Sequence, residues 1–205
     1  MYDQTIRLDE DDEQEEQQSD SEDQKGEPPM MDKMLKTRTI LLSGEVNKDL
    51  AARVIRQLLI LEQENDDPIY VFIDSPGGDA DAGYAMFDAI RFVKPQVFTV
   101  GVGLVASAGA LVLLAADKTR RIGFPNSHYL IHQPASGTRG VATEIEIHAR
   151  EIEKMRARIN QLISDETGKP LKQVEKDTDR DYWMSAPEAI DYGLISRVVT
   201  RRADL

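Results

Sequence analysis

The sequence contains no cysteine, one tryptophan and only three histidines among its 205 residues. The absence of cysteine excludes disulfide bonds, thiolate metal sites and a cysteine nucleophile. Basic residues are outnumbered, with 25 lysines and arginines against 37 acidic residues. No basic face stands out in the pattern, which argues against nucleic acid as a partner. A chain of this length is expected to form one ordinary domain.

The negative charge is concentrated at the N-terminus. Residues 1–28 carry twelve acidic and two basic side chains, which account for ten of the twelve units of net negative charge. A segment with so few large apolar residues buries too little surface to offset its ordering entropy. We therefore expect residues 1–33 to be an acidic, disordered tail, with docking or gating as its functional alternative, and residues 34–205 to form the domain. An acidic start is the reverse of a secretory signal, so we expect a cytoplasmic location.

One uncharged stretch, residues 97–116, is long enough to cross a bilayer. A membrane helix would run through it without a break. Glycines at 101, 103 and 109, together with a β-branched first half, favour a buried strand, a glycine turn and a buried helix instead. We therefore expect no membrane span.

Short apolar runs alternate with amphipathic stretches along the rest of the chain. Strands are expected at 39–43, 69–74, 96–103, 120–124, 129–132 and 194–199. Helices are expected at 48–64 with Asn47 as its cap, from 79 or 81 to 93, and at 107–116, 143–165, 171–177 and 186–192. Such alternation requires crossover connections and predicts a mainly parallel α/β fold.

Ser107 lies where an apolar strand gives way to an apolar helix. Unpaired N–H groups and the helix dipole at that point would favour ionisation of a hydroxyl and stabilise a developing oxyanion, with the N–H of Ala108 as one donor. The pattern is not G-x-S-x-G, because Val105 replaces the first glycine. The alternative interpretation of Ser107 is a helix N-cap.

The turn Ser75-Pro76-Gly77-Gly78 directly follows a buried strand. Its glycines allow a positive φ or a close approach to a ligand, so a free N–H at Gly78 is a candidate second oxyanion donor. A plain tight turn is the structural alternative. No G-x-x-x-x-G-K-[ST] motif occurs, so the chain has no P-loop for ATP.

His132 closes an expected strand, where parallel α/β folds present reactive groups, and is the candidate general base. A structural histidine is the alternative. A base histidine needs an acceptor that fixes its tautomer. Asp177, Asp179 and Asp181 crowd one stretch, and spacing alone does not choose among them.

Taken together, these motifs resemble the ClpP family, the proteolytic subunits of the Clp protease. The resemblance covers roughly residues 35–200. The matching stretches are 35–44, Ile73–Gly78, 106–110, 125–128, 131–134, 142–151, 179–181 and Ser185–Gly193. Family members usually carry methionine after the nucleophile where this chain has Ala108, a change that leaves the N–H in place. The N-terminal segment usual in the family is not recognisable here.

The resemblance implies a serine endopeptidase with Ser107 as nucleophile, His132 as base and Asp181 as orienting carboxylate. It assigns the oxyanion donors to the backbone of Gly78 and Ala108, and it requires no metal or cofactor. The implied fold is the ClpP/crotonase-like superhelix of repeated β-β-α units, with a strand-helix handle over about residues 133–165. Residues 133–141 would pair with substrate backbone.

The same resemblance implies an assembly of two stacked seven-membered rings, possibly mixed with a paralogue, in which Asp179 and Arg180 form contacts between rings. An AAA+ unfoldase partner would deliver unfolded protein substrates. One alternative is a non-catalytic or conditionally active ring subunit that works only with a paralogue. Another is an acyl-CoA enzyme of the crotonase type, since fold alone does not decide function.

Overall fold

The computed structural model describes residues 28–205. The chain divides into two compact units, Met1–Thr37 and Arg38–Leu205. The described part of the first unit holds helix α2 (Pro28–Lys36), which the sequence analysis did not predict. The expected acidic tail falls mainly on residues 1–27, which lie outside the described residues.

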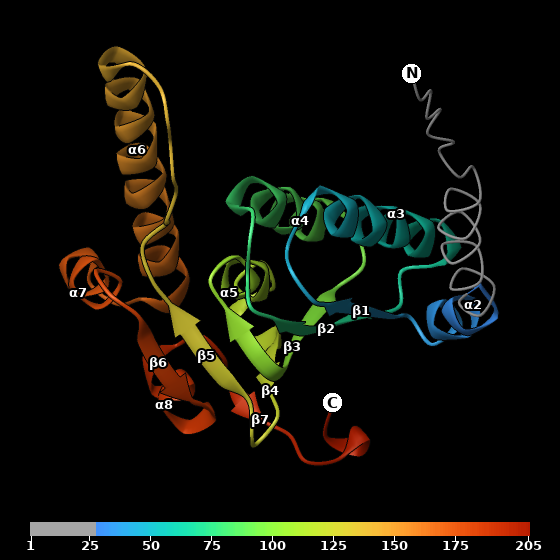
Figure 1. The fold of residues 1–205 in the computed structure, drawn as a ribbon. Coiled ribbons are helices and arrows are strands. Elements are labelled where there is room, and N and C mark those ends of the chain that lie inside the picture. The colour runs from blue at the N-terminus through green and yellow to red at the C-terminus, as the bar shows by residue number, and fades with distance from the viewer. Residues whose placement is uncertain (1–27) are drawn as a thin grey trace, which may run out of the picture. The chain divides into compact units, whose positions relative to one another are not determined.

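Seven strands form one sheet in the second unit (Figure 1). They are β1 (Thr39–Ser43), β2 (Ile69–Ser75), β3 (Val97–Ala106), β4 (Arg121–Gly123), β5 (His128–Ile131), β6 (Tyr182–Ser185) and β7 (Arg197–Val198). The main path runs β1-β2-β3-β4-β7 with parallel pairing throughout. β5 pairs in parallel with the end of β3, and β6 adds antiparallel to β5. The predicted mainly parallel α/β fold is confirmed.

Six α-helices accompany the sheet. They are α3 (Lys48–Glu64), α4 (Ala80–Phe92), α5 (Ala108–Leu113), α6 (Ala142–Thr167), α7 (Leu171–Asp177) and α8 (Ala186–Tyr192). Short 3-10 turns lie at Lys118–Arg120 and Arg202–Asp204. Figure 1 shows α3 and α4 side by side next to β1 and β2, while α6 and the segment before it extend away from the sheet as an arm.

Local capping sets the starts of the two helices beside the sheet. The side chain of Asn47 accepts from the N–H of Leu50 and begins α3, as predicted. Asp79 accepts from the N–H groups of Asp81 and Ala82 and begins α4. These bonds satisfy donors that the first turn of a helix leaves unpaired, and they fix where each helix leaves the turn before it.

The uncharged stretch 97–116 folds into strand β3 followed by the buried helix α5. Among residues 28–205, none of the helices is both long and apolar enough to span a membrane. The expected strand end at residue 103 is wrong, because β3 continues to Ala106. Strand β6 was not predicted, and the last strand is shorter than expected.

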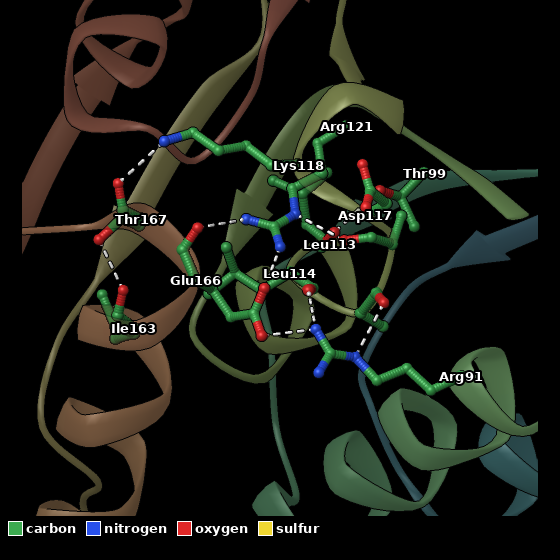
Figure 2. Close-up of polar contacts among 12 residues, drawn as sticks. Arg91, Thr99, Leu113, Leu114, Asp117, Lys118, Arg121, Ile163, Glu166 and Thr167 are labelled. Atoms are coloured by element: carbon green, nitrogen blue, oxygen red, sulfur yellow. Dashed lines mark hydrogen bonds and ion pairs between the residues drawn. The ribbon is translucent and has the colours of Figure 1, made fainter.

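The C-terminal end of α6 is fastened to the sheet by a buried charge cluster, shown in Figure 2. The side chain of Arg121 is 1% exposed and forms an ion pair with the Glu166 carboxylate. Its guanidinium also donates to the Ala116 carbonyl at 2.8 Å and to the Glu166 carbonyl at 2.9 Å. Arg91 reaches the same carboxylate from α4 at 2.5 Å. The cluster therefore fixes the base of the arm relative to α4 and β4.

Candidate active site

A bulge in β3 shifts the second half of that strand relative to β2. Ile73 of β2 pairs with Gly101, but Ser75 pairs with Val105, so two steps of β2 face four steps of β3. Gly103 has φ +57° at the bulge. The carboxylate of Asp74 accepts from the N–H of Leu104 at 3.0 Å and satisfies a donor that the bulge removes from the ladder. The shifted end of β3 then pairs with β5, which brings Ser107 beside the end of β5.

Ser107 adopts a backbone conformation that non-glycine residues rarely adopt, with φ +53° and ψ −120°. Such a conformation costs about 1–3 kcal/mol and persists only where the surroundings enforce it. The N–H of Ser107 donates to the Leu130 carbonyl at 2.9 Å, which holds the strained residue against β5. The hydroxyl makes no capping hydrogen bond to α5. The N-cap alternative is therefore wrong for the side chain.

The glycine turn packs directly on Ser107. A Cβ at Gly77 would lie 2.5 Å from the Cβ of Ser107 and 3.0 Å from the nitrogen of Ala108, and φ at Gly77 is +94°. A Cβ at Gly78, where φ is +140°, would collide with the Val46 carbonyl oxygen. Both positions therefore require glycine, because the backbone conformation and the space each exclude a side chain.

Two N–H groups at this contact are free. The N–H of Val46 donates to the Gly77 carbonyl, and the Val46 carbonyl accepts from the N–H of Asp79. The bridge between Val46 and the turn therefore does not use the N–H of Gly78. Ala108 is the first residue of α5, so its N–H has no carbonyl within the helix to which it can donate. Within residues 28–205, neither N–H has an intramolecular acceptor. The two donors lie on adjoining backbone segments and are available to an oxygen atom.

His132 and Asp181 meet where β5 ends and β6 begins. Ile131, the last residue of β5, pairs with Tyr182, the first residue of β6, so the residue after β5 and the one before β6 lie together. The expected strand 129–132 is therefore wrong at its end, because His132 follows the strand. The Nδ1 atom of His132 lies 3.1 Å from an oxygen of Asp181, whose side chain is 60% exposed. This hydrogen bond would fix the tautomer that presents a free Nε2.

The other two candidate carboxylates are engaged elsewhere. Asp177 accepts from the Tyr192 hydroxyl at 3.1 Å, and Asp179 pairs with Arg156 at 3.0 Å. The backbone carbonyl of Asp179 also accepts a hydrogen bond from the Arg180 guanidinium at 2.7 Å. The geometry therefore brings one of the three aspartates to His132, a choice that spacing in the sequence left open.

Ser107 and His132 line the same cavity of about 770 Å³, between the turn before α4, helix α5 and the arm. In the described part of the chain no hydrogen bond joins the serine hydroxyl to the imidazole. The structure thus brings together the strained serine, the two free amides and the imidazole–carboxylate pair, without the serine–imidazole bond. Loose contacts of this kind are common in unliganded sites and tighten when substrate binds.

Two residues that the sequence analysis missed also line this cavity. Tyr84 of α4 is buried, and Arg158 of α6 lies over its ring, 3.9 Å from the ring centroid. Tyr84 follows an ordinary helical pattern and Arg158 belongs to a polar helix face. No local signal in the sequence indicates that they meet.

The Clp protease family model matches residues 23–202. The chain belongs to the Clp protease family. Curated relatives named ATP-dependent Clp protease proteolytic subunit 2 occur in two treponemes. The Treponema pallidum protein is 61% identical over 183 residues, which cover 89% of this chain and 92% of the relative. The Treponema denticola protein is 60% identical over 177 residues, which cover 86% of this chain and 88% of the relative.

Among solved structures, a mutant form of ClpP1 from Listeria monocytogenes superimposes with a TM-score of 0.80 and 48% sequence identity. The match covers 85% of this chain and 98% of the Listeria chain. This Clp protease family member therefore has the ClpP/crotonase-like fold that the motifs indicated, and it is a peptidase. The expected handle corresponds to residues 133–141, which form no regular strand here, and to α6.

Proposed function

We propose that the chain is a serine endopeptidase subunit that hydrolyses unfolded proteins delivered by an AAA+ ATPase. The observation that carries this proposal is the strained Ser107 beside the free N–H groups of Gly78 and Ala108. A catalytic serine needs an exposed hydroxyl and preorganised donors at the position of the oxyanion. Relatives named as proteolytic subunits of an ATP-dependent protease support both the peptidase class and the ATPase partner.

The proposed reaction begins when Ser107 Oγ attacks the carbonyl carbon of the scissile peptide. Nε2 of His132 takes the hydroxyl proton, and the tetrahedral oxyanion accepts hydrogen bonds from the two free amides. His132 then gives the proton to the leaving amine, which breaks the peptide C–N bond and leaves an acyl-enzyme. Water, activated by the same imidazole, hydrolyses the ester and regenerates the serine. Asp181 stabilises the imidazolium in both halves.

The subunit would work inside two stacked seven-membered rings, with Asp179 and Arg180 at the contact between rings. Both side chains are exposed in the single chain, so a neighbouring subunit could reach them, although Asp179 already pairs with Arg156 within the chain. A closed chamber would keep the serine away from folded proteins, and the lack of a P-loop makes a separate ATPase necessary. A cytoplasmic location remains a prediction.

A fluorophosphonate probe tests the nucleophile. We expect labelling at Ser107 in the purified protein, and we expect Ser107→Ala to abolish both labelling and peptide cleavage while the assembled mass by native mass spectrometry is unchanged. Ser136→Ala is the matched control, because Ser136 lines the same cavity but bonds to His148 at 2.9 Å. Labelling that survives Ser107→Ala would refute the proposal.

The absent serine–imidazole bond favours one second candidate, a subunit that becomes active only with a paralogous ring. Completion of the relay would then require a contact that the isolated chain lacks. Labelling of Ser107 only after a paralogue is added would support this reading. Labelling by the protein alone would exclude it.

A further inference from the structure

The cavity beside Ser107 reaches well beyond the catalytic side chains. It continues between α5 and the base of the arm, where Leu111 and Leu114 face Ile159 and Ile163. In the proposed reaction the scissile carbonyl lies at Ser107, with its oxygen on the two free amides. The substrate side chain next to that carbonyl therefore has this cavity as its nearest enclosed space.

The wall of the cavity is not uniformly apolar. Tyr84 is 5% exposed, and its buried hydroxyl has no hydrogen-bond partner among residues 28–205. A buried hydroxyl without a partner destabilises the fold, so an arrangement that keeps one calls for an explanation. Burial raises the pKa of Tyr84, so the group is a neutral hydroxyl that is able to donate one hydrogen bond.

Arg158 adds a positive charge at the same place. Its guanidinium stacks on the Tyr84 ring at 3.9 Å, and it forms no ion pair with any described residue. Lys154, another cation of the cavity wall, is already paired with Glu151 at 2.6 Å. Arg158 lies on an exposed part of α6, so its long side chain is free to move aside when the cavity fills.

We propose that Tyr84 and Arg158 form a specificity subsite for a substrate side chain that ends in a hydrogen-bond acceptor, the amide oxygen of glutamine or the carboxylate of glutamate. The Tyr84 hydroxyl donates to that oxygen, and Arg158 favours the charged acceptor. This inference rests on the proposed function, because it places the side chain preceding the cleaved bond in the cavity. Apolar residues around the subsite contact the methylene groups of the same side chain.

The subsite would discriminate between substrate side chains by whether they accept a hydrogen bond from the buried Tyr84 hydroxyl. Glutamine and methionine are similar in length, but only glutamine offers a strong acceptor to Tyr84. A net hydrogen bond contributes about 0.5–1.5 kcal/mol, which corresponds to about a 2- to 13-fold preference. Removing the hydroxyl alone removes this preference while the ring and its contact with Arg158 remain.

The experiment compares Tyr84→Phe with the wild-type assembled enzyme on fluorogenic peptides that differ only in glutamine, glutamate or methionine before the cleaved bond. We expect the ratio of kcat/KM for glutamine to that for methionine to fall about 3- to 10-fold in the variant. Arg158→Met is expected to lower the ratio of glutamate to glutamine while the ratio of glutamine to methionine changes less than in Tyr84→Phe.

Each outcome decides the inference. An unchanged ratio of glutamine to methionine in Tyr84→Phe, with cleavage that still depends on Ser107, overturns the subsite and leaves the proposed function intact. Wild-type enzyme that cleaves none of the peptides, and no unfolded protein, overturns both. Because each ratio compares two substrates on one preparation, partial misfolding of a variant lowers both rates together and leaves the ratio unaffected.

Discussion

Substitution of Gly77 by alanine tests whether the glycine turn shapes the oxyanion site. The new Cβ would lie 2.5 Å from the Cβ of Ser107 and 2.8 Å from the Ala106 carbonyl oxygen. Neither neighbour is the end of a flexible side chain, so the turn or the serine backbone must shift. Removal of one oxyanion donor typically costs about 10²–10³ in kcat, and we expect a loss of that order because the donors on both sides of the contact move.

Gly44→Ala is the matched control for backbone strain. Gly44 has φ +90°, close to the +94° of Gly77, but no atom lies within 4 Å of the position of its Cβ. Both variants should lose about 1–3 kcal/mol of stability from the unfavourable φ, measured as a shift in the urea midpoint. Only Gly77→Ala should also lose kcat in peptide hydrolysis. Full activity in Gly77→Ala, or an equal loss in Gly44→Ala, would refute the argument.

Two further predictions concern stability. Arg121→Met should cost about 3–5 kcal/mol in urea unfolding, since it leaves a partly buried carboxylate without its main partner. Arg91→Met should cost about 1 kcal/mol or less, because Arg91 is 44% exposed. Equal losses in the two variants would contradict the conclusion that Arg121 is the main partner of Glu166 in the cluster of Figure 2. Burial raises the pKa of Tyr129 to about 12, so the unfolded chain loses this proton first, near pH 10. Stability should therefore be intact below pH 10 and fall by roughly 2–3 kcal/mol as pH rises to 12. Tyr129→Phe should flatten that pH profile, and an equally steep profile in the variant would count against this assignment.

Local signals predicted the six helices α3 to α8, although α2 was missed. Asn47 and Asp79 act within one turn of the chain, so the start of α3 was predicted and the start of α4 was placed at 79 or 81. The strands were harder to predict because their bounds depend on partners far along the chain. Strand β6 exists because it pairs with β5, about fifty residues earlier, and the sequence gives no local sign of that pairing.

The glycines of β3 show why its end was placed too early. Gly101 and Gly103 together resembled a turn. In the fold, position 101 requires glycine because a Cβ there would lie 2.6 Å from the Tyr129 hydroxyl oxygen. Gly103 forms the bulge beside Asp74. Both are requirements of contacts between strands. The motifs indicated Ser107, His132 and the glycine turn, and the family resemblance selected Asp181, which spacing alone had left open among three aspartates. The contact of Tyr84 with Arg158 was not predicted, because it depends on how the arm lies against α4.

The two halves of the site are held by contacts of different strength. Ser107, Gly77 and Ala108 are fixed by close backbone packing between buried segments. The His132–Asp181 pair depends on β6, which pairs only with β5 among the described strands, and on a carboxylate that is largely exposed. Disruption of that edge pair would separate the imidazole from its carboxylate while the two oxyanion donors stayed in place. Any contact that orders residues 179–181 therefore acts on the base and leaves the nucleophile and the oxyanion site unchanged.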